Sequence, residues 1–409
     1  MKLTKEEKSW ILYDVANSAF ILIITATIPV YFRTLAESAG VSSTNATALW
    51  GVATSVSVLA LALLSPILGA IADYKGMKKK LFVFFLAMGI LGCLSFTVTQ
   101  DWQAFLFLFI IARIGYSACN VFYDSMLVDV ATDERMDVVS SYGYAFGYIG
   151  SCVPFIIGIA LILLKPFGMT GYLPTQISFL ITILWWGLLT IPMLKNVKQT
   201  YYMEPQPHIV AEAFKRIIIT LGKIRKDKKL LYYIIGYFCY IDGVYTIISM
   251  ATTYGGEVGI DQTQMILALL LTQFVAFPCA ILAGILAKKY GSLTMIKVYI
   301  GIYMFCCVFG YQLDRAWEFW VLAVIIGTAQ GGIQSLSRSY YGKLVPKEQS
   351  NEYFGFFDIF GKFADFFGPL ILSACAILFG SSKYGVLTLI VLFIIGFWMI
   401  LKVEKLSKV

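Results

Sequence analysis

The chain has 409 residues, of which 59% are hydrophobic and 14% are charged, and its mean hydropathy is +0.78. A soluble domain cannot bury that much apolar surface, so the composition excludes a soluble enzyme and indicates a polytopic membrane protein. The formal net charge of +8 does not indicate nucleic-acid binding, because the basic residues gather beside apolar segments on the side of the N-terminus, and by the positive-inside rule this asymmetry predicts cytoplasmic termini.

Twelve apolar segments are long enough to cross a membrane, which takes about 20 apolar residues per helix. Several are interrupted by glycine, proline or charged residues, as is common in transporters. In chain order they cover residues 10–33, 47–72, 80–99, 104–128, 140–164, 177–195, 230–254, 263–287, 294–313, 317–341, 353–379 and 384–402. The sequence therefore predicts an all-α membrane protein with twelve transmembrane helices.

The longest polar stretch, residues 196–229, divides these segments into two sets of six. We therefore predict an N-terminal half over 1–195 and a C-terminal half over 230–409, joined by a cytoplasmic linker. Within the linker, residues 209–224 form an amphipathic run that a basic cluster follows. This pattern favours a helix along the membrane surface with its basic residues toward anionic lipid, and a regulatory partner site is the alternative.

A charged turn between two apolar segments occurs twice, 215 residues apart, and Pro154 and Pro369 repeat the same spacing. The chain is therefore predicted to hold two pseudo-symmetric copies of one bundle. In the first copy the glycines permit a tight turn and close helix approach. The acid is placed to cap a neighbouring helix N-terminus and to pair with a base from the other half. We predict a gating loop, not a substrate site, formed by Gly69, Asp73, Gly76, Lys78, Lys79 and, replacing the acid in the second copy, Lys288.

Polar and charged residues within apolar segments are costly in a bilayer, so they are the leading functional candidates. They form stripes on single helical faces in segments 1, 4, 7 and 10, which occupy equivalent positions in repeats of three helices. We therefore expect them to line a central pathway for a substrate or a coupling ion. The candidates are Asp14, Asn17, Arg113, Asn120, Asp124, Asp242, Tyr245, Gln330, Gln334 and Arg338, with Asp358, Lys362 and Asp365 from segment 11.

These candidates differ in their expected depth in the membrane. Arg113 and Asp242 lie nearer the middle of their segments and are our first predictions for substrate contact. Asp14, Asp124 and Arg338 lie within a few turns of the cytoplasmic ends, where a role in gating or at a helix end is favoured.

One face of segment 11 carries Asp358, Lys362 and Asp365 at i, i+4 and i+7, an acid–base–acid pattern. A structural ion pair between the halves and direct substrate contact both fit this pattern, since buried charges must be paired in either case.

Acids outnumber bases within the apolar segments, so we predict a zwitterionic or cationic solute rather than a dianion, which would require clustered arginines. The only histidine lies in the linker. If transport is proton-coupled, a carboxylate must therefore carry the proton, and Asp242 is our hypothesis for that role.

A more specific pattern comprises YDVANSAF at 13–20, YIDGVYT at 240–246 and QGGIQSLSRS at 330–339, with the pairs FG, GK and GP within 354–369. Together these runs resemble the autophagy-related vacuolar amino-acid effluxers and their bacterial relatives. The turn at Asp73 and the arginine at position 113 resemble features of the major facilitator superfamily. The resemblance implies a twelve-helix secondary transporter, with amino-acid efflux attached to the fungal members. Asp358 and Asp365 depart from the family pattern, which has small or weakly polar residues there, and they change the charge of the pathway.

The sequence therefore predicts a secondary active transporter in a bacterial plasma membrane, with both termini cytoplasmic. We expect it to move a small zwitterionic or cationic, amino-acid-like solute by alternating access of its two halves, with protons as a candidate coupling ion. Two alternatives stay open: an exporter of amphipathic or lipid-like compounds, and a membrane sensor that does not transport. Membrane lipids are the other expected partners, and no enzyme motif, cofactor site, metal site or nucleic-acid partner is predicted.

Overall fold

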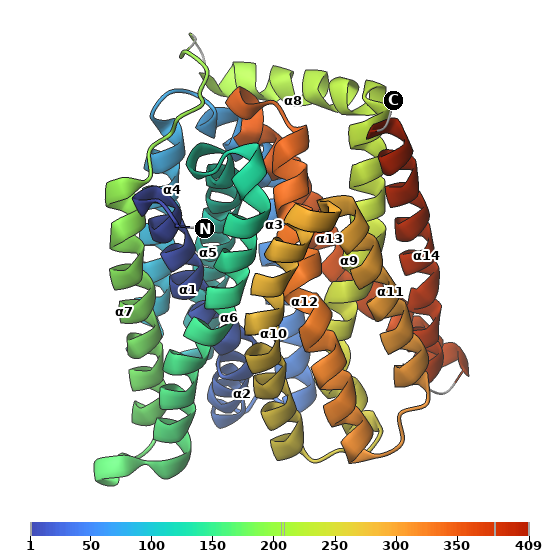
Figure 1. Cartoon of the computed structure of the whole chain (residues 1–409). Coiled ribbons are helices and arrows are strands. Elements are labelled where there is room, and N and C mark those ends of the chain that lie inside the picture. Colours follow the sequence, from blue (N-terminus) through green and yellow to red (C-terminus); the bar gives the residue numbers. More distant parts are fainter. Residues whose placement is uncertain (1, 206, 208, 380–381, 408–409) are drawn as a thin grey trace. The chain divides into compact units, whose positions relative to one another are not determined.

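The computed structural model describes residues 2–205, 207, 209–379 and 382–407, and these residues are almost entirely helical (Figure 1). Two short 3-10 helices cover Pro166–Gly168 and Lys347–Gln349. The fourteen α-helices of the described part are α1 (Lys5–Ala26), α2 (Ile28–Ser38), α3 (Ser43–Ala72), α4 (Met77–Ser95), α5 (Trp102–Val130), α6 (Asp133–Leu164), α7 (Leu173–Asn196), α8 (Ile209–Lys226), α9 (Lys228–Glu257), α10 (Gln262–Tyr290), α11 (Ser292–Tyr311), α12 (Ala316–Leu344), α13 (Ser350–Phe379) and α14 (Ser382–Ser407).

The predicted all-α membrane fold is confirmed, because every predicted segment coincides with helix in the structure. Two α-helices are additional to the twelve segments. One is α8 in the linker, and the other arises because the first segment is broken into α1 and α2 at Thr27. Pro29, the second residue of α2, has no backbone N–H to donate to the preceding turn, and it disfavours helical geometry in the residue before it.

Ten stretches of the described chain are long and apolar enough to cross a membrane, with α1 and α2 counted as one. The remaining two predicted segments correspond to α4 and α13. The first turn of α4 carries three consecutive lysines, and α13 carries Asp358 and Lys362. The lysines set α4 apart, whereas the side chains of α13 at 364–369 lie outside the described residues.

The chain forms two compact units, and neither is continuous in sequence. Unit 1 comprises residues 1–130, 146–210 and 348–355, and unit 2 comprises 131–145, 211–347 and 356–409. The beginning of α6 therefore belongs to unit 2, and the beginning of α13 belongs to unit 1. Each unit thus includes the N-terminal part of one helix whose remaining residues belong to the other unit.

Aromatic side chains fill the core of unit 1, where α1 packs against α5 and α7. The indole Nε1 of Trp10 donates to the carbonyl of Tyr123 at 2.9 Å, and the ring of Trp186 stacks on Phe20 at 5.4 Å. Close approach of α4 and α5 requires glycine, since a Cβ on Gly115 would lie 2.5 Å from the backbone nitrogen of Gly89. These contacts fix α1 beside α5, the two helices of unit 1 that carry Asp14, Asn17, Arg113, Asn120 and Asp124.

In unit 2, α10 packs on α12, α9 packs on α14, and α11 lies against both α12 and α14. Two tyrosines tie α9 to α12. Tyr233 donates to the carbonyl of Ser337 at 2.7 Å, and the hydroxyls of Tyr240 and Ser337 lie 2.6 Å apart. This tie holds the polar stripes of α9 and α12 in register.

Candidate functional site

The pathway residues predicted on α1 and α5 form one polar cluster in unit 1. The amide of Asn17 donates to the side-chain oxygen of Asn120 at 2.7 Å, and the hydroxyl of Tyr123 donates to the carboxylate of Asp14 at 2.9 Å. Asp14 and Asn17 are each only 6% exposed. The Oδ1 of Asn17 has no hydrogen-bond partner among the described residues, so the cluster keeps one buried acceptor available for a donor from solvent or solute.

Tyr116 brings the charged members of α5 into the same cluster. Its hydroxyl lies within electrostatic range of Asp14, Arg113 and Asp124. Arg113 and Asp124 are half-buried, and the guanidinium of Arg113 lies 6.0 Å from the ring centre of Phe109. The structure therefore joins Asn17 to Asn120 directly and Asp14 to α5 through Tyr123, with Arg113 and Asp124 further along the same helix.

The candidates on α9 and α12 are buried within unit 2. Asp242 is 1% exposed, Gln330 is 6% exposed and Gln334 is 9% exposed, while Tyr245 is half-buried. A carboxylate buried to this degree is costly in a low-dielectric interior, and Asp242 is the least exposed of the predicted pathway acids whose side chains the structure describes.

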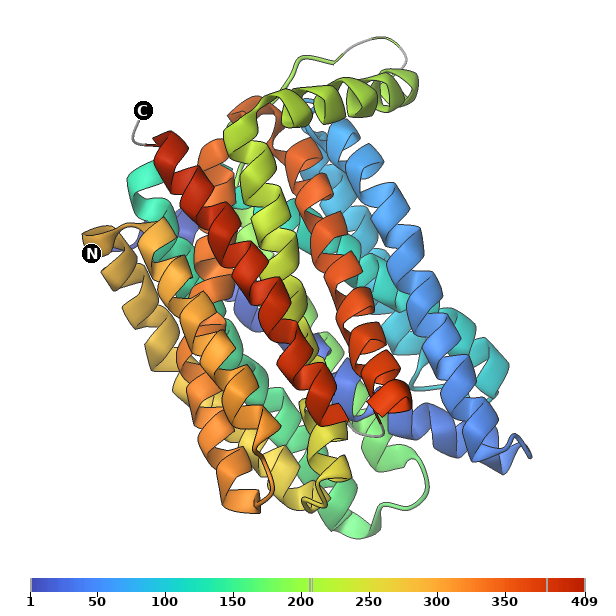
Figure 2. The same cartoon turned by 90° about the vertical axis from the view of Figure 1, so that its right-hand side faces the viewer.

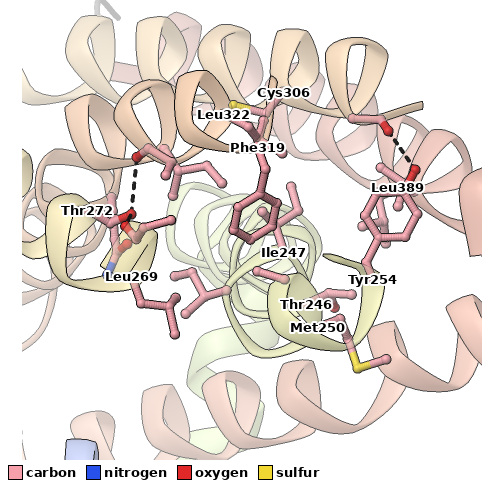
Figure 3. Close-up of a pocket in the computed structure, with 18 of the residues that line it drawn as sticks. Thr246, Ile247, Met250, Tyr254, Leu269, Thr272, Cys306, Phe319, Leu322 and Leu389 are labelled. Carbon is pink, nitrogen blue, oxygen red and sulfur yellow. Dashed lines mark hydrogen bonds between the residues drawn. The ribbon is translucent and has the colours of Figure 1, made fainter. Parts of the chain in front are cut away.

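An apolar cavity of about 70 Å³ lies among α9 to α14 of unit 2 (Figure 3). Its wall is mostly aliphatic and aromatic and includes Leu269, Phe319 and Leu322. A water molecule needs roughly 10–15 Å³ of such volume, so the cavity has room for several waters or for a small apolar group. Among the predicted pathway residues with described side chains, Gln330 alone lines it. Thr246, which also lines it, is fully buried, and its hydroxyl has no hydrogen-bond partner among the described residues.

Arg338 packs against the beginning of α6, within unit 2. Its Nε donates to the hydroxyl of Ser140 at 3.0 Å, its Nη2 donates to the carbonyl of the same residue at 3.1 Å, and its guanidinium lies 4.4 Å from the ring centre of Tyr144. The side chain is 3% exposed. These contacts fit the gating or helix-end role that the sequence favoured over substrate contact.

On α13, the ammonium of Lys362 donates to the carboxylate of Asp358 at 2.8 Å, and both side chains are 16% exposed. The sequence left an ion pair between the halves as one interpretation of this face, but this pair lies one turn apart within a single helix. The side chain of Asp365 lies outside the described residues.

The predicted gating loop in unit 1 holds the beginning of α13. The carboxylate of Asp73 accepts hydrogen bonds from the backbone and side-chain nitrogens of Asn351, at 2.9 and 3.0 Å, and from the backbone nitrogen of Glu352 at 3.3 Å. This is the helix-capping contact that the sequence suggested for the acid. A Cβ on Gly69 would lie 2.3 Å from the carbonyl oxygen of Asn351, and Gly76 turns the chain at φ +74°.

The predicted gating-loop lysines differ in their burial and in their ion pairs. Lys78 forms an ion pair with Asp129 at 2.5 Å, and both side chains are 1% exposed. The charge of Lys78 is therefore buried against a carboxylate at the end of α5. Lys79 is half-buried, and Lys288 in the second copy is exposed, with no ion pair among the described residues.

Residues 199–204, which we call the strap, form hydrogen bonds with the backbone of this loop between Ala72 and Gly76. The side chain of Gln199 donates to the carbonyl of Ala72 at 3.0 Å and accepts from the backbone nitrogen of Gly76 at 2.9 Å. Met203 donates its N–H to the carbonyl of Asp73 at 2.8 Å and accepts from the N–H of Lys75 at 3.0 Å. The strap therefore fixes the loop whose acid caps α13.

Asp129 joins the strap to the buried ion pair. Its second carboxylate oxygen accepts from the backbone N–H groups of Thr200 and Tyr201, at 2.8 and 3.0 Å. At the far end of the strap, Glu204 lies 3.7 Å from Lys75 and raises the pKa of that exposed ammonium by electrostatic attraction. The sequence did not single out Asp129, because an acid at the end of a helix is common and its partners lie far away in the chain.

Asp137 of unit 2 is a second buried carboxylate that the sequence did not identify, and it is 7% exposed. It accepts from the hydroxyls of Ser292 and Ser339, at 2.8 and 2.6 Å, and from the ammonium of Lys343 at 2.6 Å. The repeat places Asp137 where Glu352 stands in the other copy. The donor and acceptor positions are therefore exchanged between the two copies. In unit 1 the acid, Asp73, lies in the loop and accepts from the start of α13. In unit 2 the acid, Asp137, lies at the start of α6 and accepts from the hydroxyl of Ser292, the first residue of α11. The spacing of 215 residues between Asp137 and Glu352 is a sequence signal for this position, although neither residue stands out by itself.

No group of three or more His, Cys, Asp and Glu side chains suited to a metal ion occurs within the described ranges. The described residues offer buried polar clusters with hydrogen-bonding and charged groups, and buried ionic contacts at helix ends within each unit.

Comparison with known families and proteins gives matches over nearly the whole chain. The family model described as "Vacuole effluxer Atg22 like" matches residues 3–135 and 128–408. The uncharacterized MFS-type transporter YxiO of Bacillus subtilis (strain 168) is 47% identical over 401 residues, which cover 97% of this chain and 94% of that protein. Autophagy-related protein 22 of Yarrowia lipolytica is 24% identical over 315 residues, which cover 68% of this chain and 53% of the fungal protein, about half its length.

Solved structures with the same arrangement of helices are major facilitator transporters. The human organic anion transporter MFSD10 superposes with a TM-score of 0.74 at 14% identity, over 97% of this chain and 99% of that one. The transporter FucP, in its outward conformation, gives a TM-score of 0.72 at 13% identity, over 98% of this chain and 97% of that one. At these identities the likeness establishes the fold alone.

Proposed function

Because the chain belongs to the Atg22-like family of major facilitator transporters, we propose that it moves a small zwitterionic or cationic, amino-acid-like solute by alternating access. The observation that carries this proposal is the polar cluster of unit 1. Asp14, Asn17, Asn120 and Arg113 offer a carboxylate, amide groups and a guanidinium within one region. A zwitterion carries an ammonium and a carboxylate, so a cluster with both charge signs and neutral hydrogen-bonding groups suits it.

The proposed location is the plasma membrane of a bacterium, with both termini cytoplasmic. The charge asymmetry of the sequence supports this orientation. It would place the Asp73 loop, the strap and the Asp137 contacts at the cytoplasmic ends of their units.

These ionic contacts support a gating role. Asp73 holds the start of α13 within unit 1, and Asp137 with Arg338 holds the start of α6 within unit 2. Each contact consists of hydrogen bonds to a buried charge, which are strong when formed and lost together when the elements separate. We infer that they stabilise the conformation in which the cytoplasmic side is closed.

We assign proton coupling to Asp242, the least exposed of the pathway acids whose side chains are described. Asp242→Asn is expected to abolish solute uptake driven by a pH gradient in proteoliposomes while sparing exchange of labelled solute across the same membrane. Asp261→Asn is a matched control, because Asp261 is an exposed carboxylate that caps α10. Uptake by Asp242→Asn that still responds to the pH gradient would overturn the assignment.

One observation favours a second candidate, export of an amphipathic compound. The cavity of unit 2 is lined mainly by apolar side chains, among them Leu269 and Phe319, with Thr246 at its wall (Figure 3). Gln330 is a further polar residue of the lining. A solute with an apolar body and one polar end fits such a wall better than a compact ion does.

Thermal unfolding of the purified protein with amino acids, betaines, peptides and amphipathic compounds separates these proposals. Stabilisation by amino acids supports the first, and stabilisation only by amphipathic compounds supports the second. Ligands that stabilise the protein are then tested for flux in proteoliposomes. Binding without flux in either direction would refute transport and favour a membrane sensor.

A further inference from the structure

The linker helix α8 is held at the membrane boundary. It ends at Lys226, and α9 begins at Lys228, so only Asp227 separates the two helices. The side chain of Asp227 caps α9 by accepting from the backbone nitrogens of Lys229 and Leu230, both at 3.0 Å. Figure 2 shows α8 crosswise to α9 at that end. Because α9 is a membrane-spanning helix, a helix crosswise at its end runs along the membrane plane.

One side of α8 exposes an apolar stripe. Val210, Phe214, Ile218 and Leu221 follow one another at helical spacing and are 57%, 54%, 74% and 48% exposed. The helix uses a different face for packing, where Ala213, Thr220 and Ile224 are buried. The stripe therefore is not needed to hold α8 on the protein.

The polar surface beside this stripe is strongly basic. Its exposed charges are Lys215, Lys223, Arg225 and Lys226, and the only acid within the helix is Glu212. An apolar stripe flanked by exposed lysine and arginine matches a surface with negative headgroups above an apolar layer.

We propose that the apolar stripe and the basic side chains of α8 form a binding surface for anionic phospholipid. This assignment goes beyond transport, and it does not depend on which solute is moved. The Asp227 cap joins α8 directly to the start of α9. The linker is thus a lipid-contacting element of this protein in addition to a connection between its halves.

The test compares two neighbouring isoleucines of the full-length protein in lipid nanodiscs, in which both faces of the membrane are accessible. Ile218→Cys lies on the stripe, and the matched control Ile219→Cys, 47% exposed, points away from it. Each is modified with a membrane-impermeant maleimide, in discs of phosphatidylcholine alone or with about one third phosphatidylglycerol. The native cysteines are buried, or half-buried in the case of Cys279, which keeps the background low.

We expect the cysteine at position 218 to react at least fivefold more slowly than the control in the anionic discs. Replacing the four basic residues Lys215, Lys223, Arg225 and Lys226 by glutamine should remove the difference between the two lipid compositions. Equal modification rates for both cysteines in both lipids would overturn the proposal. Protection that instead rises with the number of protein copies per disc would assign the stripe to a second copy of the chain and would also overturn it.

Discussion

Breaking the buried ion pair between Lys78 and Asp129 should destabilise unit 1 strongly and unequally. Both side chains are 1% exposed and lie 2.5 Å apart. Removing one partner of a buried pair leaves an uncompensated charge, which costs about 3–5 kcal/mol of unfolding free energy. We expect Lys78→Met to fall at the lower end of this range, because the carboxylate keeps the N–H groups of Thr200 and Tyr201. Asp129→Asn should fall at the upper end, because it leaves a buried ammonium without its counter-charge.

The assay is equilibrium unfolding in mixed micelles, from which the free energy of unfolding of each variant is compared with that of the parent protein. Lys79→Met is the matched control. Because this neighbouring lysine is half-buried and forms no ion pair within the described chain, its replacement should cost less than about 1 kcal/mol.

Two results would refute the reasoning. If both single variants cost less than about 1 kcal/mol, the charges are not desolvated as their burial implies. If the double variant Lys78→Met/Asp129→Asn costs the sum of the two single changes, the two side chains are not coupled, since a true pair gives a double variant that is less damaging than the sum.

Three further predictions concern close contacts. Gly69→Ala should lower the thermal unfolding temperature clearly, because its methyl group would meet the backbone of α13, whereas Gly51→Ala in the same helix, with nothing within 4 Å of the added carbon, should leave it unchanged or slightly raised. Arg338→Lys should cost about 2 kcal/mol of unfolding free energy, since lysine cannot reproduce the two guanidinium hydrogen bonds to α6, and a cost near zero would contradict the geometry. Asn17→Ala and Asn120→Ala should each reduce solute flux, and the double variant should have about the same flux as the single variant with the lower flux. Fully additive losses of flux would argue against the 2.7 Å contact between the two side chains.

The helices could be predicted closely because their existence depends on local properties. Apolar runs of sufficient length must form helices in a bilayer, where each backbone group needs an internal partner. The linker helix was predicted over 209–224 and spans Ile209–Lys226. The sequence shows Pro29, but it did not predict the helix break at Thr27. A proline alone does not predict a break, because helices such as α3 continue through their proline.

The partners of the buried charges could not be predicted in the same way. Asp129 meets Lys78, 51 positions away, and Asp137 meets Lys343, 206 positions away. Neither acid stands out in the sequence, since each lies at a helix end where a solvated carboxylate is ordinary. Asp73, by contrast, was identified because its glycine-flanked turn is repeated, and the structure places it on the start of α13.

The sequence by itself determined the membrane class, the set of spanning helices, the linker and the polar stripes, because these follow from the free energy of placing each segment in lipid or water. Only the tertiary structure decided which charges neutralise each other, which residues the strap holds, and that Lys78 is buried while Lys288 is exposed. The physical reason is that burial and electrostatic pairing depend on distances between segments far apart in the chain, and a local pattern of residues does not contain those distances.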